Sequence, residues 1–412
     1  MTRCIILLGV IMLFASSCGA DNEEYKPLFK CSKRLDNPYG ICSHISRKGS
    51  RYEFDTREDE LKMIDSVGIS WIRTDWDWPS MMLQGTDSLR YNHFDSLMSS
   101  VHAYRKNVLG IITLRKNFKM TELDKWIRYV EHTSHHYSQV PCWEIINEVD
   151  IINHWLPGIY AKDYVKLLKV GSAVIKRDNK NTKVAFSGIA NTDTKFIDSV
   201  FSAGVSSYFD IMNVHRYSPK TVEPEVLLDY FTHLSQKLIK YSLKKNVWLT
   251  ECGTSSVVGA TEQSQANRLP RIFIISFACG IDKVFWYKSR SREQNPKDKE
   301  DFFGLWHKDY TPKPAYYAYK TLTMMCPDKS TRPSLKRKGN VFMSQWKRPD
   351  GKKVYALWTS EKDEIIKLNY SGTFTCYDIN GKEIKINGQS VEITPSVKYL
   401  VGGKKFKLNI DG

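Results

Sequence analysis

The chain has 412 residues, of which 42% are hydrophobic and 26% are charged, and its formal net charge is +16. This composition is ordinary for a folded globular protein and argues against a disordered chain. The length suggests two or three domains, although an α/β barrel uses roughly 250 residues as a single unit. We therefore expect a barrel and a smaller additional domain.

The first residues have the pattern of an export signal. Arg3 supplies a positive charge and Ile5–Phe14 is apolar, but this run is too short to span a bilayer, which takes about 20 residues. Ala15-Ser-Ser-Cys18 is similar to a bacterial lipoprotein signal, in which the cysteine carries the lipid; an ordinary cleaved signal peptide is the alternative. We expect residues 1–17 to be the signal, Cys18 to be the lipid anchor, and the protein to be an exported lipoprotein of the outer membrane, cell surface or periplasm.

Positive charge is densest near the C-terminus, where residues 328–412 carry 17 Lys and Arg against 9 Asp and Glu. Nucleic acid is not an expected partner of an exported protein. A solvated lysine-rich surface is therefore the favoured explanation, with an acidic glycan or an anionic cell surface as the alternative. The nine cysteines include no CxxC pair and no Cys/His metal spacing. We predict no metal, no cofactor, and mostly buried free thiols with not more than one disulfide.

Eight short runs rich in Val, Ile and Trp alternate with helical patterns. Their nearly continuous apolar character is typical of parallel strands covered on both faces. The expected strands are Gly40–His44, Ser70–Asp75, Val108–Leu114, Cys142–Glu148, Lys183–Ile189, Ile211–His215, Asn246–Glu251 and Lys283–Tyr287. The expected helices are Glu58–Val67, Phe94–Tyr104, Thr121–Tyr137, Ala161–Arg177, Thr194–Ala203, Glu225–Leu243, Thr261–Ala278, in which Pro270 should cause a kink or an interruption, and Pro314–Met324. This alternation predicts a (β/α)8 TIM barrel over residues 35–326; the alternative, an open doubly wound sheet, lacks its GxGxxG fingerprint.

A different pattern begins after about Cys326. Short, often alternating runs are separated mostly by Asp-Gly, Ser-Gly and Asn-Gly pairs, which are typical of hairpin turns. We expect residues 327–412 to form a small antiparallel β-sandwich. It either supports the barrel, which we favour, or binds carbohydrate through Trp346 and Trp358. Residues 18–34 would be a tether, whose last part either adds an edge strand to the sandwich or closes the bottom of the barrel.

Two glutamates close apolar runs in the middle of the chain. Glu148 ends Trp143-Glu-Ile-Ile-Asn-Glu on the fourth expected strand, and Glu251 ends Trp248-Leu-Thr-Glu on the seventh. Because reacting groups stand at the C-terminal ends of barrel strands, the two carboxylates should face one cavity. Two carboxylates about 5–5.5 Å apart allow one to protonate the leaving oxygen of a glycosidic bond while the other attacks the anomeric carbon.

These motifs resemble those of the retaining β-glycosidases of glycoside hydrolase clan A, in particular family 39 and its bacterial relatives. The likeness covers most of residues 38–321 and includes Gly68-x-x-Trp71-x-Arg73, Val214-His215-Arg-Tyr217 and Phe285-Trp286-Tyr287. It implies that Glu148 is the acid/base, Glu251 the nucleophile and Asn147 the ligand of the sugar 2-hydroxyl. An acid must stay protonated near neutral pH, so burial and the neighbouring anion should raise the pKa of Glu148. Relatives often have proline after this glutamate, and Val149 here leaves the shape of the loop open.

Other side chains should surround the two glutamates. The expected substrate-binding residues are Asn147, Arg73, His215, Tyr217, Trp286, His44, Asp75 and Trp76. Arg73 either orients Glu251 or neutralises core carboxylates such as Glu144, and Tyr217 should donate a hydrogen bond to the nucleophile. Trp286 should form the floor under the reacting sugar, because flat aromatic faces stack on pyranose rings.

Further residues compete for roles at the cavity. Asp75 and Asp77 are rivals for catalysis but are expected to bind sugar hydroxyls instead. The remaining tryptophans at strand ends or in the following loops, Trp78, Trp155 and Trp306, would serve either as outer subsites or as ordinary anchors. Residues 288–311 should form a wall of the cavity.

The sequence thus predicts a retaining β-glycosidase that hydrolyses a β-linked oligo- or polysaccharide through a glycosyl-enzyme intermediate. Its expected partners are a carbohydrate substrate, a membrane through Cys18, and a glycan-utilisation assembly. A transglycosylase would share these residues but exclude water. A catalytically inactive glycan-binding lipoprotein would keep the tryptophans but lose one glutamate, and both glutamates are present.

Overall fold

The computed structural model describes residues 23–47, 57–83, 88–151, 159–217, 223–257, 259–360, 362–386 and 388–409. The expectations for the signal peptide, Cys18 and Trp155 fall outside these ranges. Within them, no helix combines the length and the apolar character that crossing a membrane requires.

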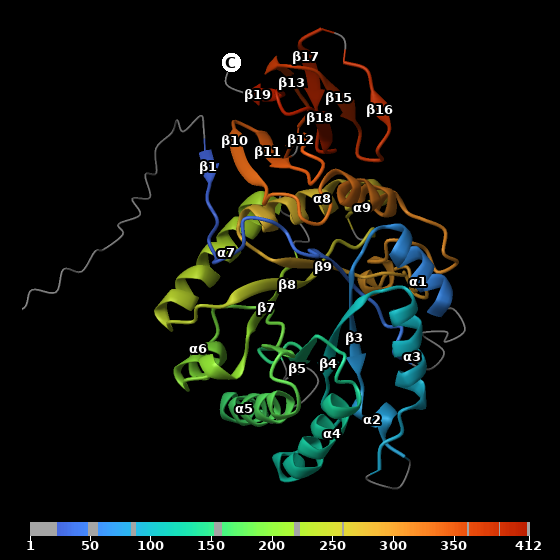
Figure 1. Cartoon of the computed structure of the whole chain (residues 1–412), viewed down its shortest axis with the longest axis vertical. Helices are drawn as coiled ribbons and strands as arrows, with labels where there is room; N and C mark the ends of the chain where they lie inside the picture. The colour runs from blue at the N-terminus through green and yellow to red at the C-terminus, as the bar shows by residue number, and fades with distance from the viewer. Residues whose placement is uncertain are drawn as a thin grey trace, which may run out of the picture.

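A closed barrel of eight parallel strands forms the larger part of the molecule (Figure 1). In barrel order the strands are β2 (Tyr39–Cys42), β3 (Trp71–Trp76), β4 (Asn107–Ile112), β5 (Cys142–Ile145), β6 (Lys183–Ala185), β7 (Ile211–His215), β8 (Asn246–Cys252) and β9 (Lys283–Tyr287). Every expected strand is present, although β5 and β6 end earlier than the sequence suggested. The predicted TIM barrel is confirmed, and the doubly wound sheet is wrong.

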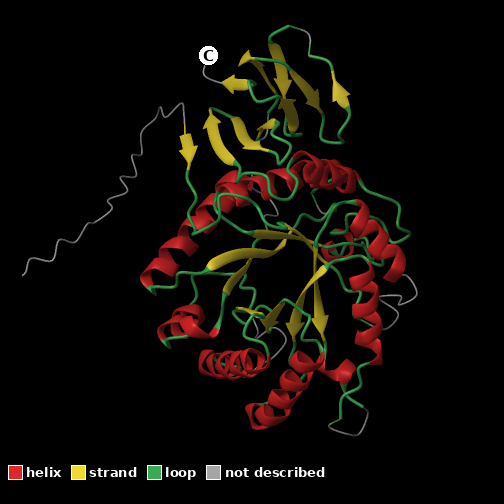
Figure 2. Ribbon diagram, in the orientation of Figure 1, coloured by secondary structure: helices red, strands yellow, loops and turns green. Residues whose placement is uncertain are grey.

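Helices surround the barrel, as Figure 2 shows. They are α1 (Arg57–Ser66), α2 (Trp78–Met81), α3 (Asn92–Ala103), α4 (Leu123–His136), α5 (Ala161–Asp178), α6 (Lys195–Ser202), α7 (Glu223–Lys240), α8 (Glu262–Ala278) and α9 (Pro314–Met325). Helix α8 runs through Pro270, so the expected interruption is wrong. A proline inside a helix costs about 3 kcal/mol. Burial of every residue from Leu269 to Ala278 offsets that loss.

The C-terminal region forms an antiparallel β-sandwich on one side of the barrel, next to α8 and α9 (Figure 1). Its main sheet has the order β1-β10-β11-β12-β18-β15-β16, and β13 pairs with β17 and β14 with β19. The bounds are β1 (Glu23–Tyr25), β10 (Ser334–Lys338), β11 (Val341–Lys347), β12 (Lys353–Thr359), β13 (Glu364–Lys367), β14 (Asn369–Ser371), β15 (Phe374–Tyr377), β16 (Glu383–Ile384), β17 (Ser390–Ile393), β18 (Lys398–Gly402) and β19 (Lys407–Asn409). Because β1 pairs with β10, the segment before the barrel adds an edge strand to the sandwich.

The sandwich is packed on α8 and α9, which lie between it and the barrel (Figure 1). Trp346 and Trp358 are buried and belong to the same apolar cluster as the barrel helices. Trp346 donates its indole N–H to the carbonyl of Met325 at 2.8 Å, and the buried Arg271 of α8 donates to the carbonyl of Thr359 at 3.1 Å. The two tryptophans therefore join the domains and offer no face to a carbohydrate.

The seven cysteines in the described ranges are all free thiols. Six of them are buried, and the seventh, Cys31, is half-buried. Burial raises the pKa of thiols such as Cys142 and Cys252, which keeps them protonated and unreactive. The expectation of mostly buried free thiols is confirmed for this part of the chain.

Candidate active site

The C-terminal ends of the barrel strands surround a cavity of about 640 Å³. Its lining includes Cys42, His44, Arg47, Arg73, Thr74, Asp75, Ile111, Asn147, Glu148, Tyr217, Glu251, Tyr287, Arg292, Lys299, Glu300 and Phe303. The last four lie in the segment 288–311, which forms a wall as expected. Five of the eight expected substrate-binding residues line the cavity, namely Asn147, Arg73, Tyr217, His44 and Asp75, and Trp76 and Trp286 are not among them. His215 is also absent from the lining, and its position is described below with Glu148.

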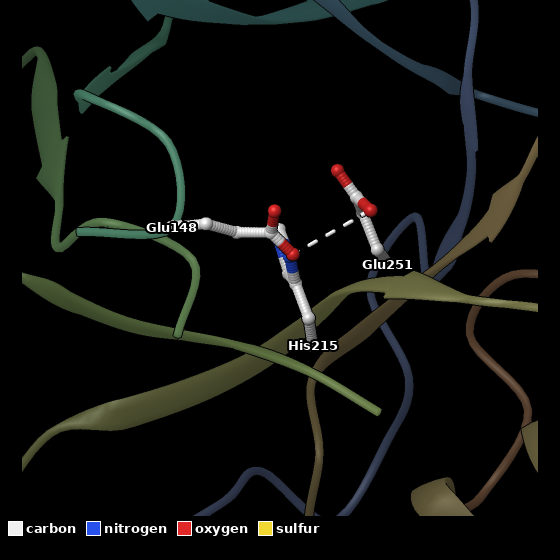
Figure 3. A group of neighbouring side chains, drawn as sticks. All are labelled: Glu148, His215 and Glu251. Atoms are coloured by element: carbon white, nitrogen blue, oxygen red, sulfur yellow. Dashed lines mark hydrogen bonds and ion pairs between the residues drawn. The ribbon is translucent and has the colours of Figure 1, made fainter. Parts of the chain in front are cut away.

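Glu148 and Glu251 face each other across this cavity, with His215 beside them (Figure 3). Glu148 lies in the loop after β5, and Glu251 is part of β8. Each glutamate places a carboxylate oxygen within 4.8 Å of the other. This separation fits the roughly 5–5.5 Å of retaining glycosidases, whereas inverting enzymes need about 6.5–9.5 Å to admit a water molecule.

Glu251 is held by a donor at each of its two oxygens. Arg73 donates from Nη1 to Oε1 at 2.6 Å, and the hydroxyl of Tyr217 donates to Oε2 at 2.6 Å. The hydrogen bond expected from Tyr217 is therefore present. Two short bonds from fixed partners orient the carboxylate and stabilise its negative charge, as a nucleophile requires.

Arg73 also binds the carboxylate and the amide that precede Glu148. Its Nε and Nη2 atoms donate to the two oxygens of Glu144 at 2.8 and 2.9 Å, and Nη2 donates to Oδ1 of Asn147 at 2.5 Å. Glu144 has no exposed surface. Arg73 therefore has both of the roles that were considered for it. Its guanidinium neutralises the core carboxylate of Glu144 and orients Glu251.

His215 binds Glu148 rather than facing the cavity. Its Nδ1 lies 2.9 Å from Oε1 of Glu148 and 3.6 Å from Oε2 of Glu251, and the ring has no exposed surface. The expectation that His215 contacts the sugar is therefore wrong. Gly188, in the segment after β6, packs against the imidazole ring, so this histidine supports the two carboxylates from behind.

The pKa values of this pair move in opposite directions. Burial raises the pKa of Glu148, but the hydrogen bond and charge of His215 outweigh burial and hold that pKa below its ordinary value. Burial lowers the pKa of His215, but the charge of Glu251 and the contact with Glu148 raise it above its ordinary value. The expected rise in the pKa of Glu148 is thus wrong. The sequence did not reveal that His215 would contact this carboxyl and stabilise its charged form.

The loop that carries Glu148 has an unusual backbone. Strand β5 ends at Ile145, and Ile146 and Glu148 have φ angles of 65° and 48°. Left-handed conformations at such residues cost about 1–3 kcal/mol each and persist only when the surroundings hold them. Here the N–H of Glu148 donates to the carbonyl of Gly188 at 3.0 Å, and the N–H of Val149 donates to Oγ of Ser187 at 3.2 Å. A proline at position 149 could not make the second bond, so valine has a structural role there.

His44 and Asp75 form a charged group with Arg47 at another side of the cavity. Arg47 Nε donates to Oδ2 of Asp75 at 2.6 Å, and Nδ1 of His44 lies 3.7 Å from the same oxygen. Burial raises the pKa of Asp75, but Arg47 and His44 lower it by more than burial raises it. Asp75 is therefore anionic. Burial and Arg47 lower the pKa of His44 to about 4, so this ring is neutral near pH 7. Asp77, the other rival for catalysis, instead caps α2 by accepting from the N–H of Ser80.

The tryptophans expected at the rim are in the core. Trp76 and Trp286 have no exposed surface, and Trp78 and Trp306 are also buried. Successive strand residues point to opposite faces, so Phe285 and Tyr287 face the barrel interior while Trp286 faces the helices. Trp286 donates its indole N–H to the carbonyl of Phe303 at 3.3 Å. The predicted floor at Trp286 is therefore wrong, and Tyr287 is the aromatic side chain of this strand that lines the cavity.

The cavity residues that the sequence reasoning missed include Arg47, Tyr287, Lys299, Glu300 and Phe303. Tyr287 could have been found from the two-residue period of its strand, because it lies two residues after Phe285 and points to the same face. The other four lie in loops, where the sequence carries no period that would reveal which side chains reach the cavity.

Glu148, His215 and Glu251 are also close enough to be considered as metal ligands. Both oxygens of Glu251 are already bound, one by the guanidinium of Arg73 and the other by Tyr217. A cation at Glu251 would be repelled by the charge of Arg73 only a few ångströms away. The donor set is better suited to moving protons than to holding a metal.

No family model and no curated protein matches the chain. Solved structures do share its architecture. A family 39 glycoside hydrolase from the gut symbiont Bacteroides cellulosilyticus matches with a TM-score of 0.70 and 20% identity, over 89% of this chain and 81% of that one. A glucosidase from Croceicoccus marinus matches with a TM-score of 0.69 and 11% identity, over 91% and 97% of the two chains. The fold is that of the family 39 glycoside hydrolases.

A further match supports the same fold. A family 39 β-xylosidase from Caulobacter crescentus has a TM-score of 0.64 and 13% identity, over 92% of this chain and 99% of that one. These matches cover the barrel and the sandwich together. The resemblance that the sequence motifs suggested is thus shown at the level of the fold.

Proposed function

We propose that the chain is a retaining glycoside hydrolase that cleaves a β-linked oligo- or polysaccharide by double displacement. The observation that carries the proposal is the pair Glu148 and Glu251, whose carboxylate oxygens come within 4.8 Å in one cavity. Their partners differ, since Glu251 is bound by Arg73 and Tyr217 while Glu148 is bound by His215. Two carboxylates in different environments can take the two different roles that this chemistry needs.

In the first step Glu251 attacks the anomeric carbon while Glu148 passes to the leaving oxygen the proton that it shares with His215 across their 2.9 Å contact. Asn147 accepts a hydrogen bond from Arg73 at Oδ1, which fixes its amide and turns the NH₂ group away from Arg73. That NH₂ group is suited to bind the sugar 2-hydroxyl, an interaction that strengthens as the oxocarbenium ion forms. Tyr217 and Arg73 keep the nucleophile in place until it has reacted.

In the second step Glu148 removes a proton from water, and the resulting hydroxide displaces Glu251 from the sugar. Glu251 is neutral while it is esterified, so the charge that raises the pKa of His215 is reduced at this stage. Glu148 has lost its proton to the leaving group and keeps its bond to His215. The same carboxyl therefore changes from acid to base without any movement of the chain.

Alanine variants of the two glutamates test this assignment. Glu251→Ala and Glu148→Ala should each lose at least about a thousandfold in kcat on an aryl glycoside that the unaltered protein cleaves. Azide should rescue Glu251→Ala and give a glycosyl azide of inverted anomeric configuration, because the small anion occupies the space of the lost carboxylate. Glu383→Ala, in the exposed strand β16, is the matched control and should keep full activity. Full activity in either active-site variant would refute the proposal.

We also propose that the protein is exported and anchored through a lipid on Cys18. The signal-like residues 1–17 support this, and β1, which pairs with the sandwich, begins only five residues after Cys18. The folded part would then lie close to the membrane surface. Cys18→Ser should move the protein from the membrane fraction to the soluble fraction of the cells that produce it; retention in the membrane fraction would contradict the anchor.

A further inference from the structure

Lys288 is a buried cation without an anionic partner. It follows β9 directly, and only 2% of its surface is exposed. Its ammonium group makes no hydrogen bond or ion pair with any residue in the described ranges, and it lies 5.7 Å from the centre of the Tyr287 ring. Lysines are almost never this buried unless they are paired, because the charge loses its hydration. Burial accordingly lowers the pKa of Lys288 to about 8.

Lys288 is not itself among the residues that line the cavity, but residues around it form one wall of the cavity. Arg47, Arg292 and Glu300 line the cavity and are close enough to shift the pKa of Lys288. Lys299 lines the same wall and forms no ion pair with any described residue. We call Arg47, Lys288, Arg292 and Lys299 the basic wall.

Most carboxylates near the basic wall already pair with an arginine of that wall. Asp75 accepts from Arg47 at 2.6 Å, and Asp301 lies 2.7 Å from Nε of Arg292. Burial raises the pKa of Glu300, the remaining carboxyl that lines the wall, while the charges of Lys288 and Lys299 lower it. Asp298 also lies 3.7 Å from Nη2 of Arg292. Lys288 and Lys299 are therefore the two cations of the basic wall that form no ion pair with a described residue.

The barrel order places the basic wall on one side of the reacting bond. Strand β9 lies between β8, which carries Glu251, and β2, while β5, which precedes Glu148, is on the opposite side of the barrel. The acid must be next to the leaving group, because it protonates the leaving oxygen. The sugar that Glu251 attacks therefore extends toward β2 and β9, where the basic wall lies.

We propose that the basic wall binds an anionic substituent, a carboxylate or a sulfate, on the sugar that is transferred to Glu251 or on a sugar attached to its non-reducing side. A bound anion would add negative charge beside Lys299, which lines the cavity, and near Lys288 behind it. This substrate class rests on the proposed hydrolase function.

Paired substrates that differ only in charge test the basic wall. Aryl β-D-glucuronide and the 6-sulfate of aryl β-D-glucoside carry an anionic group where aryl β-D-glucoside has a neutral hydroxymethyl group. The unaltered protein should favour at least one charged substrate by about tenfold or more in kcat/KM, and the comparison of the two identifies carboxylate or sulfate. Lys288→Met should lose that preference, and Lys288→Arg, which keeps the charge, should retain most of it. Lys407→Met, at an exposed lysine of β19, is the charge-matched control.

Two results would overturn the basic wall: equal kcat/KM for charged and neutral substrates, or an unchanged preference in a folded Lys288→Met variant. If Lys288→Met does not fold, Lys299→Met on the exposed part of the wall replaces it, and the preference should fall in the same direction.

Calorimetric titration separates this proposal from the hydrolase proposal. Glu251→Ala, which keeps the basic wall, should bind D-glucuronate or D-glucose 6-sulfate at least about tenfold more tightly than D-glucose. Binding of this kind in a protein that hydrolyses no glycoside would refute the hydrolase and support the anion site. Hydrolysis with equal or absent binding of all three sugars would refute the anion site and leave the hydrolase.

Discussion

At the scale of single residues, Arg73 holds the active site together. Its guanidinium contacts Glu144, Asn147 and Glu251, and only 3% of its side chain is exposed. Neither carboxylate can be rehydrated easily if the arginine is removed, since Glu144 is completely buried and Glu251 nearly so. The same contacts therefore serve stability and function.

Replacing Arg73 by methionine should lower the free energy of unfolding by about 3–5 kcal/mol, because it leaves two buried charges without their partner. Urea unfolding followed by fluorescence measures the change. Arg177→Met, which breaks exposed pairs with Glu131 and Asp178, is the control and should cost less than about 1 kcal/mol. A similar small loss for Arg73→Met would show that the buried network does not stabilise the fold.

His215 should control the alkaline side of the pH profile. Burial raises the pKa of Glu148, and His215 and the charge of Arg73 lower it. His215→Phe removes the larger of the two lowering contributions, so the pKa should rise. Glu148 would then keep its proton to higher pH, and the alkaline limb of kcat/KM should move upward. Tyr217→Phe removes a donor from Glu251 only, so the alkaline limb should stay in place. An alkaline limb that moves downward in His215→Phe would contradict the assigned contact.

At the scale of elements, the segment that follows β6 positions both His215 and the Glu148 loop. A Cβ on Gly188 would lie 2.0 Å from Nε2 of His215, and the carbonyl of Gly188 accepts the N–H of Glu148. Glycine is thus required here for space. The segment between β6 and α6 thus positions His215 and Glu148, although none of its described residues lines the cavity.

Gly188→Ala should displace His215 and cost about a hundredfold in kcat/KM, since shifts of about 1 Å in a reacting group can have that effect. Gly403→Ala is the matched control, because a Cβ there meets nothing within 4 Å. Steady-state kinetics on both variants, after circular dichroism has confirmed folding, measures the difference. Equal activity of the two would show that the position of His215 does not matter.

Sequence patterns predicted the elements better than they predicted the directions of side chains. Continuous apolar runs identified all eight barrel strands, because both faces of these strands are covered. Because the run of β9 is apolar throughout, its sequence did not show which side chains point into the barrel and which point toward the helices. Trp286 was therefore assigned to the cavity in place of Tyr287. The turn at Ile146 could not be predicted either, since no glycine marks its left-handed backbone and the bonds that hold it come from Ser187 and Gly188.

At the scale of the whole molecule, the barrel and the sandwich share one apolar core. Trp346 and Trp358 belong to the same cluster as Phe277 and Tyr319 of the barrel helices. Arg271 adds buried hydrogen bonds from α8 to the carbonyls of Thr359 and Ser360. The sandwich is therefore part of the folded unit that carries the active site.

Scanning calorimetry should accordingly show one cooperative transition for the whole chain. Arg271→Met should lower its midpoint, because the carbonyls of Thr359 and Ser360 lose their buried donor at about 1–3 kcal/mol. Arg337→Met, on the sandwich strand β10, is the control for loss of an arginine outside the interface. Two separate transitions in the unaltered protein would show that the domains fold independently.

The central claim is that Glu251 attacks the sugar that Glu148 activates. Incubation with a 2-deoxy-2-fluoro aryl glycoside slows release of the intermediate, because fluorine destabilises the oxocarbenium-like transition state. Mass spectrometry should then show one fluorosugar per chain, on the peptide that contains Glu251. Labelling of another residue by the fluorosugar, or turnover of the normal aryl glycoside with inversion at the anomeric carbon, would contradict the account.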